Sequence, residues 1–187
     1  MSLREIWREH ERIQAHVTQA MLGGPLPPCN RGSWFCPCVS LRDARTIAAL
    51  LKHYAITTVF DLGAGDLRLA RFLAEEGFTV TAYETYSELI GAITDACDCT
   101  KIRIRCRDYW TDWKRITNNG AAILVLGGSQ RIPALPSNLT ILGYDRIGTV
   151  AVKDGVIRGR WGRFDECPLG RSLHGWIREQ TEISRPT

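Results

Sequence analysis

The chain has 187 residues, of which 44% are hydrophobic and 24% are charged, and its formal net charge is +4. A chain of this length can bury one sizeable core, and no segment approaches the roughly eighteen consecutive apolar residues of a membrane span. Residues 1–21 are charged and helical in pattern, which is unlike a signal peptide, so a cytoplasmic protein is expected.

The opening segment predicts an amphipathic helix because its apolar residues recur at steps of three and four. They are Leu3, Ile6, Trp7, Ile13, Val17 and Met21. We expect this helix to act as an N-terminal lid or brace. Ser40 followed by Asp43 resembles a capping box for a second helix that runs through Leu51. We therefore expect one compact domain, in which N-terminal helices and a proline-rich connector (residues 1–54) pack on a core formed by residues 55–187.

The connector between these helices contains Cys29, Cys36 and Cys38, and a Cys97-x-Cys99 pair lies further along. Because the seven cysteines are an odd number and no secretory signal is found, reduced thiols are expected rather than disulfides. Zinc thiolates are more often two to four residues apart, so no metal site is predicted. The alternative is a zinc site built from these cysteines, with or without His53. Trp34 and Phe35 either stack on a substrate ring or pack onto the core.

A glycine turn between two apolar runs is the most informative feature of the sequence. The β-branched and apolar residues 57–62 predict a strand, and Gly63-Ala64-Gly65 follows it directly. Apolar residues at helical spacing come next, Gly77 is a plausible helix cap, and residues 78–83 predict a second strand that ends before Glu84. This order of elements predicts a βαβ unit that binds a nucleotide-containing cofactor, with Glu84 contacting the ribose hydroxyls.

Two features of the turn disfavour a dinucleotide. Leu67 and Arg68 occupy the places where a third glycine is usual in dinucleotide-binding folds. Asp66, predicted to be the helix N-cap, would place a carboxylate against a pyrophosphate. An NAD-dependent oxidoreductase is therefore the weakest of the candidate functions.

The sequence Asp61-Leu62-Gly63-Ala64-Gly65-Asp66-Leu67 resembles the first motif of the class I S-adenosylmethionine-dependent methyltransferases. The resemblance implies that Gly63, Ala64 and Gly65 approach the amino-acid part of the cofactor. It implies that Asp61 orients the turn or meets the amine, and that Glu84 binds the ribose. Residues 101–106 predict a third strand, after which Asp108 and Tyr109 would lie beside the adenine. Leu67 departs from the motif, because many family members have a further glycine there.

Residues 121–126 predict a central fourth strand, and Gly127-Gly128-Ser129-Gln130 follows at its carboxyl end. The motifs of exocyclic amino-group, cytosine carbon-5 and ribose methyltransferases are missing there, so no catalytic residue is assigned. Ser129 and Asp145 are candidates for the acceptor side only. Methyl transfer from a sulfonium can proceed largely by alignment of the reacting atoms.

The C-terminal part predicts strands over residues 139–143, 149–153 and 156–161 and a final helix over residues 172–180. Five residues cannot hold the helical crossover of a parallel pair, so these strands are expected to form an antiparallel edge. The predicted fold is thus α/β, a Rossmann-like three-layer sandwich with a mostly parallel sheet and antiparallel C-terminal edge strands.

The predicted function is methyl transfer from S-adenosylmethionine to an unidentified acceptor, with nucleic acid favoured over a small molecule. Arg158, Arg160 and Arg163 flank Trp161, which suits stacked bases and phosphates, although a solvated strand explains the same pattern. A non-catalytic S-adenosylmethionine-binding or regulatory module is the alternative, since no acceptor motif is found.

Overall fold

The computed structural model describes residues 2–22, 41–117, 120–126, 138–144, 148–154 and 156–161. The strands in these ranges are β1 (Thr58–Leu62), β2 (Thr79–Glu84), β3 (Ile102–Cys106), β4 (Ala122–Val125), β5 (Thr140–Tyr144), β6 (Gly148–Lys153) and β7 (Val156–Trp161). The helices are α1 (Leu3–Leu22), α2 (Leu41–His53), α3 (Arg68–Glu75), α4 (Ser87–Ala96), the short 3₁₀ helix η1 (Tyr109–Asp112) and α5 (Trp113–Thr117).

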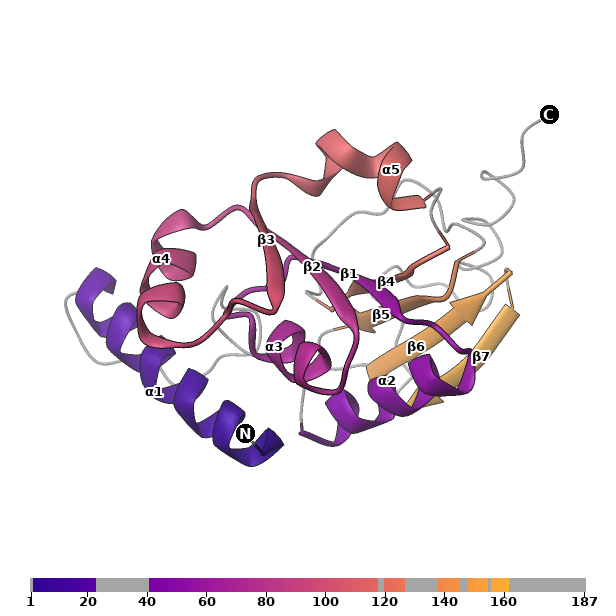
Figure 1. Ribbon diagram of the computed structural model, residues 1–187, viewed down its shortest axis with the longest axis horizontal. Coiled ribbons are helices and arrows are strands. Elements are labelled where there is room, and N and C mark those ends of the chain that lie inside the picture. Colours follow the sequence, from indigo (N-terminus) through magenta and orange to yellow (C-terminus); the bar gives the residue numbers. More distant parts are fainter. Residues whose placement is uncertain are drawn as a thin grey trace.

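The seven strands form one sheet in the order β3-β2-β1-β4-β5-β6-β7 (Figure 1). The pairs from β3 to β5 are parallel, whereas β6 pairs antiparallel with both β5 and β7. The strand order reverses between β1 and β4, as in other doubly wound sheets, and ligands of such folds bind beyond the carboxyl ends of the strands at that point. The predicted Rossmann-like fold with an antiparallel C-terminal edge is confirmed.

Successive side chains along a strand point to opposite faces of the sheet, and the apolar ones form two clusters, one on each face. In β1, Val59 belongs to the cluster that contains α1 to α4, whereas Phe60 and Leu62 belong to the cluster with Tyr109 of η1 and Ile116 of α5. Figure 1 shows α2 and α3 on one side of the strands and α5 on the other. The sheet is therefore the middle of three layers.

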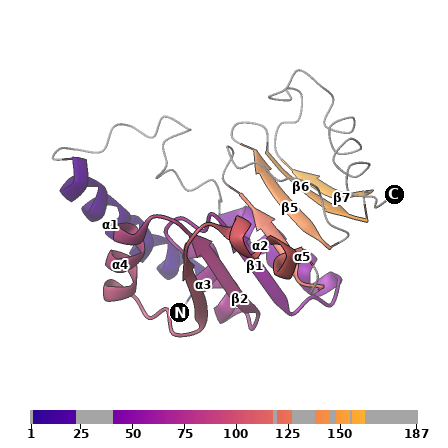
Figure 2. The same ribbon diagram turned by 90° about the horizontal axis from the view of Figure 1, so that it is seen from above.

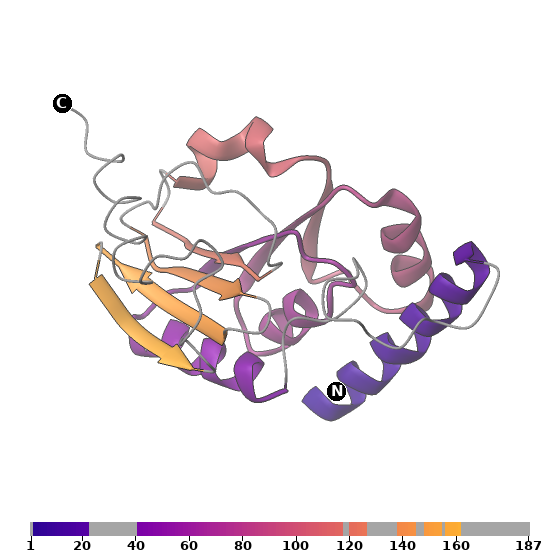
Figure 3. The ribbon, with the colours of Figure 1, turned by 180° about the vertical axis from the view of Figure 1, so that it is seen from behind.

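Helix α1 adds an outer layer over α3. Every residue of α3 from Arg68 to Ala74 is buried, although surface helices normally bury only one stripe. Ile6 and Trp7 of α1 pack in the same cluster as Leu69 and Phe72. Figure 2 shows α1 beside α4 at the β3 end of the sheet, and Figure 3 shows α1 from behind, far from β6 and β7. The predicted opening helix therefore covers α3.

Three elements, α4, η1 and α5, are not among the predicted ones. Gly91 and Thr94 lower the helix propensity of α4, and η1 with α5 is too short for periodicity to reveal it. The predicted final helix over residues 172–180 and the connector with Trp34 and Phe35 lie outside the described residues. None of the helices in the described ranges is long and apolar enough to cross a membrane.

Candidate cofactor-binding site

The turn after β1 lies against the end of β2. The N–H groups of Gly63 and Ala64 both donate to the carbonyl oxygen of Tyr83, at 2.9 Å each. Gly63 and Gly65 have φ angles of 71° and 56°, which glycine adopts without strain. Among the described residues, a Cβ atom built on Gly65 would meet nothing within 4 Å apart from its chain neighbours. The described part of the chain therefore leaves the main chain at Gly65 open to a ligand.

Asp61 is the buried acid beneath this turn. It is 3% exposed, and burial raises its pKa to about 7, with the negative charges of Glu84 and Asp66 adding to the effect. In the sheet, Asp61 is paired with Ala82 of β2 on one side and with Leu124 of β4 on the other. Asp61 therefore lies between two neighbouring strands. A cationic group that reached Asp61 would favour the ionised carboxylate, because opposite charges nearby lower a carboxyl pKa.

Glu84, the last residue of β2, is held against the turn by backbone donors. Its Oε2 accepts from the N–H of Gly65 at 2.9 Å. Its Oε1 accepts from the N–H groups of Thr85 and Tyr86 at 2.7 and 3.1 Å. The Thr85 hydroxyl also donates to Oε1, at 3.4 Å. An ionised carboxylate offers about four acceptor positions, so a hydroxyl ligand would have to replace one of these four internal donors.

Asp66 is not the N-cap of α3, and that prediction is wrong. The N-cap is Leu67, which adopts a left-handed conformation with φ 61°, whereas the Asp66 carboxylate accepts from the N–H and the Nε of Arg68 at 3.2 and 2.7 Å. The Arg68 guanidinium lies 5.7 Å from the ring centroid of Trp7. Since Arg68 partly neutralises Asp66, the charge of Asp66 is a weaker argument against a dinucleotide than expected.

Asp108 and Tyr109 follow β3 at the same end of the sheet, as predicted, but with internal roles. The Asp108 side chain caps η1 by accepting from the N–H of Trp110 at 3.0 Å. Tyr109 is 8% exposed and belongs to the second apolar cluster. Their predicted contact with adenine remains a prediction.

Aromatic and basic side chains come from η1, from α5 and from the edge strand β3 with the residue after it. We call Arg103, Arg105, Arg107, Trp110 and Trp113 the aromatic–arginine surface. The rings of Trp110 and Trp113 have centroids 5.5 Å apart, and Trp110 is 38% exposed. Arg103 and Arg105 pair in register with Thr81 and Tyr83, so both lie on the face of the edge strand that carries the Tyr83 ring. Arg107 and the Tyr83 hydroxyl both contact the carboxylate of Asp112.

His10, Arg68 and Arg71 are buried polar residues that the sequence reasoning missed. The signal was present for His10, because it stands four residues after Ile6 and three after Trp7, on the apolar face of α1. His10 contacts both Arg71 and the carbonyl oxygen of Asp66 in the turn.

Other predicted candidates cannot be placed. Cys29, Cys36, Cys38, Ser129, Asp145 and Arg163 lie outside the described residues, as do the side chains of Arg160 and Trp161. Cys97 and Cys99 are free and buried, and burial raises the pKa of the Cys99 thiol to about 11. The described ranges contain no group of three or more potential metal ligands.

Comparisons with known proteins show a similarity of fold to solved structures. No family model matches the sequence, and no curated protein is significantly similar to it. Among solved structures, the chain is similar to a "putative caffeoyl-CoA O-methyltransferase" from Staphylococcus aureus, with 12% identity and a TM-score of 0.47. The similarity covers 57% of this chain and 58% of that protein, so the two share part of their length only.

Proposed function

We propose that this chain binds S-adenosylmethionine at the turn after β1 and transfers its methyl group to an acceptor. The observation that carries the proposal is the placement of two carboxylates, Asp61 and Glu84, at an open glycine turn. When bound, S-adenosylmethionine supplies an electrophilic methyl group on a cationic sulfonium. Gly63, Ala64 and Gly65 would lie against its amino-acid part, Asp61 would attract the amine, and Glu84 would bind the ribose.

The charges at the turn favour this cofactor over a pyrophosphate. Asp61 and Glu84 are close enough for the charge of Glu84 to raise the pKa of Asp61. A phosphate group would add a further negative charge, whereas an amine or a sulfonium would reduce the repulsion. The guanidinium groups of α3 are paired with other carboxylates, because Arg68 contacts Asp66 and Arg71 contacts Glu9 of α1. They are therefore not used to bind a phosphate on the open side of the turn. The argument from charge therefore rests on Asp61 and Glu84.

Calorimetric titration of the chain with S-adenosylmethionine, S-adenosylhomocysteine and NAD tests the proposal. We expect both sulfur nucleosides to bind and NAD not to bind at the same concentrations. Binding of NAD alone would refute the assignment and favour an oxidoreductase. Binding of the sulfur nucleosides without methyl transfer to any pool of RNA, DNA, protein or metabolites would leave a non-catalytic module.

Replacing Glu84 by alanine should weaken the binding of S-adenosylhomocysteine by about 1–3 kcal/mol, the scale of a lost charged hydrogen bond. The loss has two sources, because the ribose acceptor disappears and the N–H of Gly65 loses its partner. Glu84→Gln should retain part of the affinity through its amide oxygen. Glu88→Ala, at an exposed position in the first turn of α4, is the matched control. Equal affinities in all four proteins would remove Glu84 from the site.

We further propose that the acceptor is a single-stranded nucleic acid that stacks on the aromatic–arginine surface. An exposed tryptophan beside arginines suits bases and phosphates, since every base offers a flat face and every phosphate a negative charge. Exposed Lys114 and Arg115 on α5 add positive charge next to Trp113. Arg107, Trp110 and Trp113 follow the carboxyl end of β3, which is the end of the sheet where the cofactor site is proposed.

Trp110→Ala should weaken the binding of a single-stranded oligonucleotide by about 1–3 kcal/mol, the value of one stacked base. Arg103→Gln should weaken it for all sequences and reduce the salt dependence of the affinity by about one phosphate contact. Val156→Ala, an exposed apolar residue on the opposite edge strand, serves as the control. Fluorescence anisotropy with RNA and DNA oligonucleotides measures both effects, and a Trp110→Ala protein that binds normally would argue for a different acceptor.

A further inference from the structure

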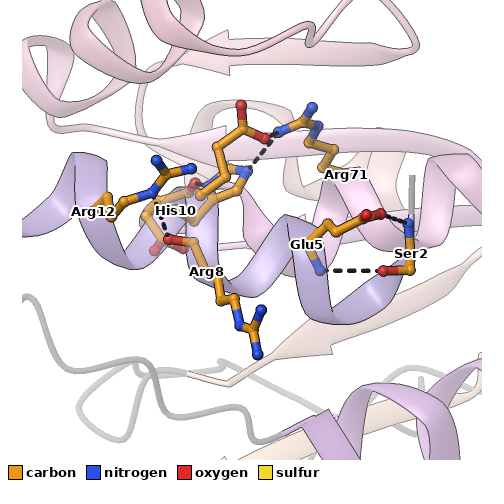
Figure 4. Close-up of polar contacts among 8 residues, drawn as sticks. Ser2, Glu5, Arg8, His10, Arg12 and Arg71 are labelled. Atoms are coloured by element: carbon orange, nitrogen blue, oxygen red, sulfur yellow. Dashed lines mark hydrogen bonds and ion pairs between the residues drawn. The ribbon is translucent and has the colours of Figure 1, made fainter.

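His10 connects α1 to the cofactor turn from the far side of α3. Its side chain is fully buried, and its Nδ1 lies 2.6 Å from the carbonyl oxygen of Asp66. Its Nε2 lies 3.3 Å from Nη1 of Arg71, which also donates to Glu9 at 2.6 Å. Figure 4 shows His10 of α1 directed toward Arg71, with a dashed contact between them.

These two partners determine which nitrogen of His10 carries the proton. A carbonyl oxygen can only accept, so Nδ1 must donate to Asp66. A guanidinium can only donate, so Nε2 must be an unprotonated acceptor. The contacts are satisfied together only by the neutral ring with its proton on Nδ1. Burial lowers the pKa of His10, which agrees with a neutral ring at pH 7.

The Asp66 carbonyl belongs to the peptide unit that sets the conformation of Leu67. The N–H of the same unit, that of Leu67, donates to the carbonyl oxygen of Ala64 at 3.1 Å. Both ends of the unit are therefore held, one by the turn and the other by His10. Leu67 has φ 61°, a left-handed conformation that is unfavourable for leucine. Rotation of this peptide unit is the simplest way to relieve Leu67, and it would break both hydrogen bonds.

We infer that His10 is a positioning residue for the cofactor turn: by holding the Asp66–Leu67 peptide unit, it keeps Leu67 left-handed and Gly65, two residues earlier, in place. Gly65 donates to Glu84, so the constraint extends from α1 to the proposed ribose-binding acid. The effect on cofactor affinity rests on the proposed function, whereas the effect on the peptide unit does not.

The charged groups around His10 come from three elements. Glu9 and Glu11 lie on α1, and Asp66 precedes α3, which provides Arg68 and Arg71. The thiols of Cys97 and Cys99, at the end of α4, interact electrostatically with Arg71. Protonation of Nε2 would place an N–H against the Arg71 guanidinium, so the surroundings favour the neutral ring.

The protonation pattern can be measured on the unmodified chain. Nitrogen-15 NMR at pH 7 should show one histidine with a protonated Nδ1 and an unprotonated Nε2, and that signal should be absent from His10→Asn. The opposite assignment for His10 would overturn the inference, whether or not any cofactor binds.

A double-mutant comparison at position 67 tests the mechanical role. Leu67→Gly and Leu67→Ala both remove the leucine side chain beyond Cβ, but only alanine disfavours φ 61°. The unfolding equilibrium constant of the glycine variant should therefore be about tenfold smaller than that of the alanine variant. When the same two variants are made in a His10→Leu background, the peptide unit can rotate and relieve the unfavourable φ of the alanine. The ratio of the two unfolding equilibrium constants should then fall to about threefold or less. A ratio that stays near tenfold would mean that His10 only fills space.

Affinity for S-adenosylhomocysteine supplies the functional readout. His10→Leu should weaken binding by about tenfold, whereas His10→Asn, whose amide N–H can replace Nδ1–H, should stay within about threefold of the unmodified chain. His53→Leu, at an exposed position near the end of α2, is the control. Equal losses in the leucine and asparagine variants would contradict the role of the donor. If the unmodified chain binds no cofactor, the proposed function fails, while the NMR and the unfolding ratio still decide the inference.

Discussion

Asp61→Asn should be more stable than the unmodified chain at pH 8, and its advantage should shrink toward pH 5. The pKa of Asp61 is raised to about 7 in the folded protein, from an ordinary value of 3.8. The folded state therefore binds the proton more tightly than the unfolded state. The stability that this proton provides is complete below pH 3.8 and is lost as the pH rises through 7. The difference between the two proteins should grow by about 2–3 kcal/mol from pH 5 to pH 8.

Thermal or urea unfolding at the two pH values measures this difference. Asp98→Asn is the control, because hydrogen bonds from Thr100 lower the pKa of the exposed Asp98 below its ordinary value of 3.8, so its effect on stability should be the same at pH 5 and pH 8. In a Glu84→Gln background, the stability difference between the protein with Asp61 and its Asp61→Asn variant should change less between pH 5 and pH 8, because a negative charge beside Asp61 has been removed. A stability difference that does not change with pH would show that Asp61 is already ionised at pH 5. Asp61→Asn should also weaken S-adenosylmethionine binding if Asp61 attracts the amine.

Trp7→Ala should lower the free energy of unfolding by about 3–5 kcal/mol, the usual cost of truncating a buried tryptophan. Trp7 is 5% exposed and packs edge-on against Phe72, with ring centroids 6.4 Å apart. Its ring also covers the guanidinium of Arg68, at 5.7 Å from the ring centroid. Truncation would therefore open the contact between α1 and α3 and admit water to Arg68.

Urea unfolding followed by circular dichroism measures the loss. Trp7→Phe should cost less than alanine because it keeps an aromatic ring against Phe72, and Val156→Ala at an exposed position should have little effect. A small loss in Trp7→Ala would mean that α1 is dispensable for the core.

Much of the fold could be predicted because the relevant signals are local. The apolar strands and the glycine turn gave β1, α3 and β2 within a residue or two, and the short link before β6 gave the antiparallel edge. Helix α4 was missed because Gly91 and Thr94 weaken its local pattern. Such misses reflect packing that stabilises a segment of low intrinsic propensity.

The site was predicted less completely, because its contacts join distant residues. The sequence placed Asp61, the glycine turn and Glu84 at adjoining strand ends, and the structure agrees. It could not show that Glu84 accepts from Gly65, 19 residues away, or that His10 contacts Asp66, 56 residues away. Asp66 was misassigned for a local reason, because the left-handed Leu67 is the N-cap and the Asp66 carboxylate pairs with Arg68, two residues away. The ligand roles of these residues remain predictions.

The left-handed leucine at position 67 bears on how such turns change during evolution. Its torsion is one that glycine adopts freely, yet a leucine holds it and buries its side chain completely. Leucine in this conformation costs about 1–2 kcal/mol, which the burial of its side chain can offset. A covering helix thus lets such a turn keep its shape with leucine at this position. A version of this chain without α1 should favour glycine at position 67.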